Sequence, residues 1–168
     1  MAGRSGGFGG RRSGGGSFGR RGFGRSRKEK TPEEAASPDA ARAKAIGLLA
    51  RRDLPAQALK GRLSDAGFDT GAAEAAVTEL QDERLVDDAR YVDSAVLSRI
   101  AKGQGPVRIA LELKRLGIAP ELIEPAVDAK ADDWADRAAD LRKRRFGRAV
   151  PDDRKERAKQ VRFLLYRG

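Results

Sequence analysis

The chain has 168 residues and contains neither Cys nor His, which excludes disulfides and any metal site built on these ligands. The side chain that most often transfers protons near neutral pH is therefore missing, and catalysis is disfavoured. The chain carries 35 Lys plus Arg against 25 Asp plus Glu, a net charge of +10.

This charge comes from the two ends of the chain. Residues 1–30 carry a net charge of +8, residues 31–140 carry −6 and residues 141–168 carry +8. Two basic ends around an acidic middle are typical of a protein that holds a polyanion at particular places. No apolar stretch approaches the ~20 residues of a membrane-spanning helix, and the start of the chain does not resemble a secretory signal, so we expect a cytoplasmic protein with no membrane partner.

Residues 1–37 are predicted to be a disordered tail and linker. Eleven of the 20 Gly lie within residues 1–30, mixed with Arg and with Phe8, Phe18 and Phe23, and no apolar periodicity occurs there. The mixture resembles arginine-glycine segments that bind single strands through charge and stacking, and the alternative is a flexible solubilising extension. The segment from Thr31 to Ser37 is interpreted as the linker.

A repeat of fifty residues runs through the rest of the chain. Leu59, Leu63 and Gly67 return as Ile109, Leu113 and Gly117, and other apolar positions recur at the same offset without a gap. A repeat of this length in a helix-forming sequence indicates stacked helical units, each too small to bury its apolar face alone. We therefore predict an all-α fold of tandem three-helix repeats in an elongated, curved stack, with units at 38–85, 86–131 and 132–168.

The first unit is predicted to contain helices at 38–52, from Pro55 to the stop at Gly67, and at 70–84. Ser37 followed by Pro38 is an N-cap with proline at the first helical position.

The second unit follows the same plan, with Asp87 or Asp88 as the first cap and a break at 103–106. Its second helix stops at Gly117 and Pro120 opens its third. Pro125 lies inside that third helix, where it should remove one backbone hydrogen bond.

The third unit is predicted to be shorter than the other two. Trp134 lies on the apolar side of its first helix, and Pro151 is expected to open its second. Leu164 and Gly168 match Leu113 and Gly117 at an offset of 51. The repeat predicts a third helix after Gly168, so we expect either that this unit is naturally incomplete or that the C-terminus has been cut.

Several side chains have both a functional and a structural interpretation. The pair Asp87-Asp88 could hold a metal ion, but similar pairs recur at other predicted helix starts, which favours helix capping. Tyr91 and Trp134 could stack on a base, but they occupy apolar helical positions, which favours core packing. We predict no catalytic, cofactor or metal site.

Clustered cations are the candidate contacts for DNA or a protein partner. The cluster in the third unit is too dense for a solvated stripe, although an exposed helix end, where cations favour the helix dipole, is the alternative. The candidates are Lys102, Arg108, Lys114, Arg115, Arg142, Lys143, Arg144, Arg145 and Arg148.

The stretch 85–92, Leu-Val-Asp-Asp-Ala-Arg-Tyr-Val, resembles a motif of the RecX family of bacterial recombination regulators, with Val92 in place of the usual Ala. The match continues in order over roughly residues 40–168, through Gly105-Pro106 and Gly117-Ile118 to the closing 163–168. The family's motif residues here are Asp87, Asp88, Tyr91, Gly105 and Gly117, which we interpret as structural.

The resemblance implies a small helical protein that is not an enzyme and needs no cofactor. Such proteins bind the RecA recombinase filament on DNA and restrain its ATPase, strand-exchange and co-protease activities, in recombination, repair and the SOS response. We expect a monomer. The alternative is a stand-alone DNA- or RNA-binding helical-repeat protein, because three-helix units can place a helix in a groove and both ends are basic.

Overall fold

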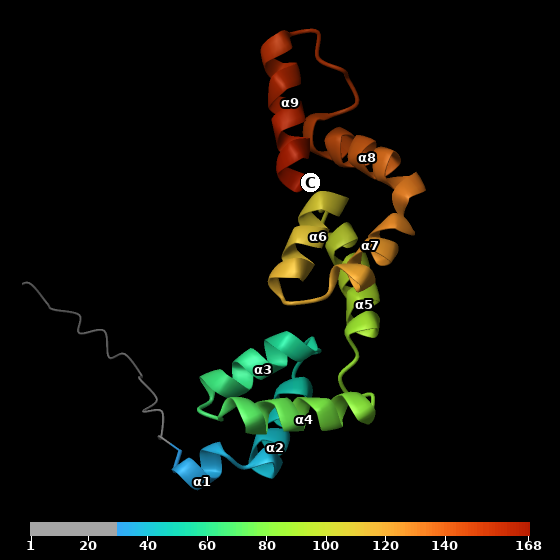
Figure 1. Cartoon of the computed structure of the whole chain (residues 1–168). Helices are drawn as coiled ribbons and strands as arrows, with labels where there is room; N and C mark the ends of the chain where they lie inside the picture. The colour runs from blue at the N-terminus through green and yellow to red at the C-terminus, as the bar shows by residue number, and fades with distance from the viewer. Residues whose placement is uncertain (1–29) are drawn as a thin grey trace, which may run out of the picture.

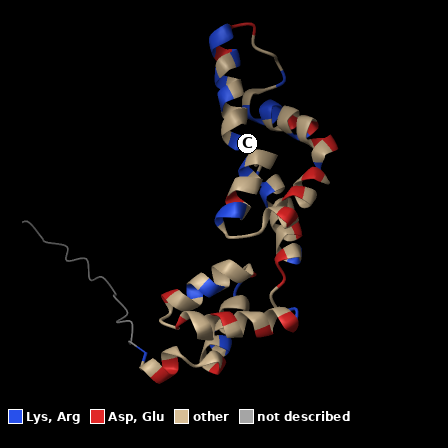
Figure 2. Ribbon diagram, viewed as in Figure 1, with Lys and Arg blue, Asp and Glu red and all other residues tan. Residues whose placement is uncertain are grey.

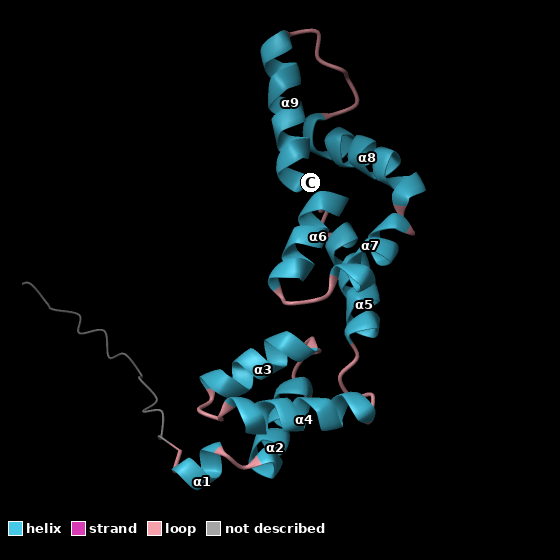
Figure 3. Ribbon diagram, viewed as in Figure 1, coloured by secondary structure: helices cyan, strands magenta, loops and turns pink. Residues whose placement is uncertain are grey.

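The computed structural model describes residues 30–168, and every regular element within that range is helical (Figure 3). The predictions for the Gly- and Arg-rich tail lie outside these residues, except at its end. The predicted all-α fold is confirmed.

The first unit comprises three helices around one core, preceded by a short fourth helix. Ser37 and Asp69 cap α2 and α4 by accepting the backbone N–H of Ala40 and Ala72. The core consists mainly of small and branched side chains that recur at helical spacing, including Ala45, Leu59, Leu63, Val77 and Leu80. The helices are α1 (Pro32–Ala35), α2 (Pro38–Leu49), α3 (Ala56–Asp65) and α4 (Thr70–Asp82).

The segment predicted as a linker contains α1 instead. Thr31 and Glu34 form a reciprocal capping box, which stabilises this single turn. The carbonyl of Ala35 accepts the N–H of Asp69, and Lys30 lies over the ring of Phe68 with its Nζ 3.9 Å from the centroid. The end of the predicted linker is therefore attached to the first unit, through long-range contacts that local sequence patterns do not reveal.

The second unit repeats the arrangement around a separate core. Its helices are α5 (Asp88–Ala101), α6 (Pro106–Arg115) and α7 (Pro120–Asp128), and α7 continues through Pro125. The core side chains are Val92, Ala95, Val96, Ile109, Leu113, Ile118, Ile123 and Val127.

The third unit has no comparable core. It consists of a 3-10 turn (Ala131–Asp133), α8 (Trp134–Phe146) and α9 (Arg154–Arg167), and Gln160 is its only buried residue. The rings of Phe146 and Phe163 meet edge to face, 5.3 Å apart between centroids, and join the two helices. Trp134 packs on the core of the second unit. This unit is therefore ordered largely by its neighbour.

Some predicted helix boundaries differ from the structure. The second helix of the third unit begins at Arg154 rather than at Pro151, because Asp153 accepts the N–H of Glu156 and so supplies the cap. The first helix of the first unit ends at Leu49, three residues before the predicted end at 52.

A glycine with a positive φ closely follows the second helix of each unit. Gly67, Gly117 and Gly168 have φ of 87°, 79° and 91°, in the left-handed region that favours glycine. The repeat read from the sequence is thus a repeat of backbone geometry, and it extends to the last described residue.

Figure 1 shows the units following one another as an elongated, curved stack, with α1–α4 at one end and α8–α9 at the other. In the part of the chain that the structure describes, no helix combines the length and apolarity needed to cross a bilayer.

A hydrogen bond between units joins the first to the second. Asp88 Oδ1 accepts the backbone N–H of Ala56 at 2.8 Å. Ala56 is the first residue of α3, and its N-cap, Pro55, has no side-chain acceptor. Asp88 therefore caps a helix of the preceding unit, while Asp87 caps its own helix by accepting the N–H of Arg90 at 2.9 Å.

Candidate functional site

The second and third units meet where the end of α9 abuts the start of α6. The N–H of Gly105 donates to the carbonyl of Arg167 at 2.7 Å, and the N–H of Val107 donates to the carbonyl of Gly168 at 3.3 Å. The first N–H groups of a helix have no partner within that helix, so α9 supplies the missing acceptors. A positive helix N-terminus also faces a negative C-terminus here, which favours the contact.

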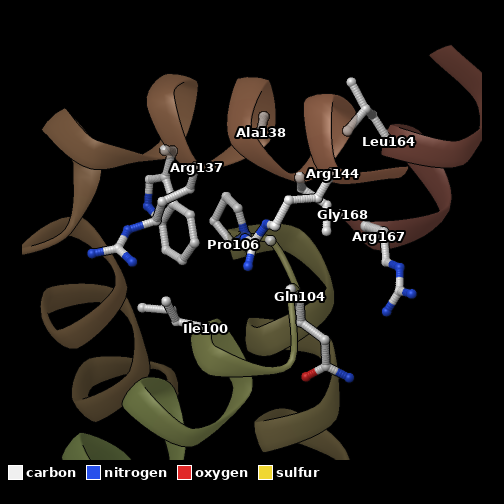
Figure 4. Close-up of a pocket in the computed structure, with 13 residues that line it drawn as sticks. Ile100, Gln104, Pro106, Arg137, Ala138, Arg144, Leu164, Arg167 and Gly168 are labelled. Carbon is white, nitrogen blue, oxygen red and sulfur yellow. The ribbon is translucent and has the colours of Figure 1, made fainter. Parts of the chain in front are cut away.

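The joint encloses a small pocket of about 120 Å³. Figure 4 shows it between α8 and the turn that precedes α6, with Ile100 and Pro106 on one side and Ala138 and Leu164 towards the other. Two buried polar atoms in this region, Gln104 Oε1 and Arg167 Nε, have no hydrogen-bond partner. The contact between these two units therefore leaves part of its buried hydrogen-bonding capacity unused.

A second hollow at the joint, of about 310 Å³, is lined by cations. Lys102 at the end of α5, Arg144 and Arg145 of α8, and Arg167 of α9 surround it, together with Phe163. No acidic residue lines it. We call this hollow, defined by these four cations, the basic groove.

The groove lies at the basic end of the described chain. Figure 2 shows Lys and Arg gathered on α8 and α9, while Asp and Glu are frequent along α7 and the start of α8. The local potential at the groove is therefore positive although the middle of the chain is acidic.

Four of the candidate cations are engaged within the protein. Arg108 pairs with Glu112 at 3.0 Å and lies over the ring of Tyr166, and its side chain donates to the carbonyl of Tyr166 at 3.2 Å. Lys114 is 3.9 Å from Glu124, and Lys143 is 3.3 Å from Asp140. Arg142 is the fourth.

Arg142 holds the loop between α8 and α9. Its guanidinium donates to the carbonyls of Gly147, Arg148 and Ala149 and to Oε1 of the buried Gln160, at 3.1–3.2 Å. These hydrogen bonds give Arg142 a structural role, because most of its fixed fork of donors is already occupied.

The remaining candidates have no ion pair to the described residues. They are Lys102, Arg115, Arg144, Arg145 and Arg148, all exposed. Three of them, Lys102, Arg144 and Arg145, line the basic groove, so the structure brings together residues that lie more than forty positions apart in the sequence.

The motif residues occupy packing positions. Asp87 and Asp88 cap two different helices, and Tyr91 is half-buried against the second core. Gly105 leaves room for Gly168, because a Cβ at Gly105 would overlap the carbonyl oxygen of Gly168. Gly117 has a left-handed backbone conformation that favours glycine, and a Cβ there would lie 2.5 Å from Cγ of Gln57 in the first unit. Among residues 30–168 no cluster of acidic side chains suited to a metal ion is present.

Glu112 anchors a network that the sequence did not suggest. It accepts hydrogen bonds from Arg99, Arg108 and Gln104 at 2.9–3.1 Å. Partial burial alone would raise the pKa of the Glu112 carboxyl, but the hydrogen bonds from Arg108 and Arg99 outweigh it and hold this pKa below its usual value. Because Arg108 also contacts Tyr166 of α9, Glu112 supports the joint indirectly.

The stability that Glu112 contributes is expected to depend on pH. Its pKa is lower in the folded protein, so its contribution is fully present above the unfolded value of about 4.3 and is lost as the pH falls through the folded pKa. Urea unfolding of the wild type and of Glu112→Gln should therefore differ in free energy at pH 7, and this difference should shrink progressively as the pH falls below about 4.3. An equal difference at every pH would contradict this role.

Sequence reasoning missed Glu112, Arg167 and the structural role of Arg142. Arg167 directly precedes Gly168, the glycine that matches Gly67 and Gly117 in the repeat, and this position is a signal that points to it. The partners of Glu112 and Arg142 depend on how helices pack, and no local pattern marks them.

The chain matches two domain models of one family. Residues 87–127 match the second three-helix domain of RecX, and residues 131–168 match the third. A regulatory protein RecX from Halorhodospira halophila is 40% identical over 136 residues, covering 81% of this chain and 84% of that protein. One from Xanthomonas axonopodis pv. citri is 38% identical over 145 residues, covering 86% and 84%.

Solved structures agree at the level of the fold. The crystal structure of RecX from Lactobacillus salivarius superposes with a TM-score of 0.67 at 20% identity, over 78% of this chain and 87% of that one. Another regulatory protein RecX gives a TM-score of 0.63 over 78% of this chain and 68% of that one. Since relatives near 40% identity cover most of the chain and of their own length, the chain belongs to the RecX family of regulatory proteins.

Proposed function

We propose that this protein binds the RecA recombinase filament on DNA and inhibits its ATPase, strand-exchange and co-protease activities. Its membership of a family of regulatory proteins named RecX carries the proposal. The shape supports it, because an elongated, curved stack of small units can follow the helical groove of a filament and contact more than one subunit (Figure 1).

The charge distribution also supports this function. The exposed cations at the third unit suit DNA phosphates within the filament or acidic surfaces of its subunits, and the acidic middle suits basic surfaces. Binding of this kind requires no chemistry from the protein. Lys102, Arg115, Arg144, Arg145 and Arg148 are the proposed contact residues, since the other candidates already have partners within the fold.

The proposal predicts direct inhibition in a purified system. Addition of the protein to RecA filaments formed on single-stranded DNA should lower the ATPase rate and strand exchange in a dose-dependent manner, and inhibition should be complete at or below one protein per recombinase. Unchanged rates at equal concentrations would refute it.

The basic groove favours one alternative, a stand-alone DNA- or RNA-binding protein. This alternative predicts tight binding to bare DNA, with an affinity that falls steeply with salt, and no effect on RecA beyond competition for DNA. Adding excess bare DNA to an inhibited RecA reaction separates the two functions. The added DNA reverses inhibition that arises from competition for DNA, but it does not relieve inhibition by a filament-bound protein.

A further inference from the structure

We propose that phosphates of a nucleic-acid backbone bind in the basic groove and thereby hold the third unit against the second. The inference deepens the proposed function, since the filament carries DNA, but it concerns the isolated protein and is tested without recombinase.

The groove exists only when the two units are docked. Lys102 belongs to the second unit, whereas Arg144, Arg145 and Arg167 belong to the third. A backbone that contacts all four cations therefore spans the joint. Separation of the units would divide the groove and remove part of the contact surface from any bound anion.

The four cations repel one another across the joint. No acidic side chain lines the groove, and none of the four takes part in an ion pair with the described residues. Their repulsion opposes docking of the third unit on the second, whereas a bound phosphate attracts the cations of both units. The two non-bridging oxygens of a backbone phosphate match the two-pronged fork of an Arg side chain well.

Arg167 links the groove to the docking contact itself. Its Nη1 donates to the carbonyl of Lys102 at 3.4 Å, its guanidinium lies 5.4 Å from the centroid of the Phe163 ring, and its buried Nε has no partner. Its own carbonyl accepts the N–H of Gly105. The side chain that lines the groove and the carbonyl that caps α6 thus belong to one residue, so an anion that orders the first also orders the second.

Two backbone amides report on docking. The N–H groups of Gly105 and Val107 lie at the start of α6, where the helix itself offers no acceptor, and both donate to α9. Their hydrogen exchange therefore requires the joint to open. A ligand that binds only the docked form multiplies the docking equilibrium by one plus the ratio of its concentration to Kd.

The test combines binding and exchange on the full chain. A fluorescent oligo-dT is titrated against the wild type, against Arg144→Glu/Arg145→Glu, and against Arg154→Glu/Lys155→Glu, which makes the same charge change at exposed positions at the opposite end of α9. The groove variant should bind roughly tenfold or more weakly, and the slope of log affinity against log salt should fall by about 1.4, the share of two phosphate contacts. The control should stay close to the wild type.

Exchange provides the second readout. Oligo-dT at ten times its Kd should slow exchange of the Gly105 and Val107 amides by about tenfold in the wild type and not in the groove variant. Circular dichroism verifies that the variants are folded, and Arg144→Gln/Arg145→Gln replaces the groove variant if charge reversal itself unfolds the third unit.

Several results would overturn the proposal. Equal affinity of the groove variant and the wild type would place the binding site elsewhere. Binding of oligo-dT without slower exchange at Gly105 and Val107 would show that the bound anion does not hold the third unit against the second. Stronger protection by a polyglutamate peptide of equal charge than by oligo-dT would show that the groove serves an acidic protein and not nucleic acid.

Discussion

Replacing Gly105 by alanine is expected to release α9 from the second unit. The φ of −96° at Gly105 suits any residue, so the requirement for glycine is one of space: a Cβ there would overlap the carbonyl oxygen of Gly168, which is backbone and cannot turn aside. Overpacking of this kind costs about 1–3 kcal/mol, and each hydrogen bond lost between Gly105 or Val107 and α9 adds about 1 kcal/mol.

The release of α9 can be measured at individual amides. Hydrogen exchange at Val107 should accelerate in Gly105→Ala, and α9 should become more sensitive to limited proteolysis, while the first unit keeps its exchange rates. Gly61→Ala is the matched control, because it makes the same change inside α3 with no atom within 4 Å of the new methyl group, and it should stabilise the helix by about 0.5–1 kcal/mol. Equal protection of Val107 in both variants would mean that the joint accommodates the methyl group.

Replacing Asp88 by alanine is expected to uncap α3 and to loosen the joint between the first two units. Loss of a capping acceptor costs about 1–2 kcal/mol, and the effect falls on a helix that is 32 residues away in the sequence. The amide of Ala56 should exchange faster, and small-angle scattering should show a broader distribution of distances within the molecule.

Two variants separate this role from ordinary capping. Asp87→Ala should destabilise the start of α5 and leave the amide of Ala56 protected, because Asp87 accepts only from Arg90. Asp88→Asn keeps an acceptor and should retain most of the protection at Ala56. If Asp88→Ala and Asp87→Ala change Ala56 equally, Asp88 does not act between units.

The sequence predicts those features of the fold that depend on local rules. It indicates Ser37 as a helix cap and Gly67 and Gly117 as helix ends, because these roles depend on backbone chemistry within a few residues. The repeat then predicts the all-helical stack, since equal spacing of apolar residues implies equal packing.

The features that the sequence could not predict depend on contacts between units. The sequence pattern favours a cap on the helix that follows for the pair Asp87-Asp88, yet Asp88 caps a helix of another unit. The density of cations at 142–148 predicts one binding surface, yet Arg142 is hydrogen-bonded to the loop that follows α8, and Arg144 lines a groove with Lys102. Composition locates such cations in the chain, but only packing decides which of them remain available.

The unequal cores of the units also determine how the protein loses its structure. The first two units each enclose buried side chains of their own, whereas α8 and α9 depend on the second unit for burial. Local contacts of this kind produce rapid folding of each closed unit, and weak contacts between units allow separate transitions. Calorimetry should therefore resolve more than one melting step, with α8 and α9 opening first, so a single melting temperature would not describe this molecule.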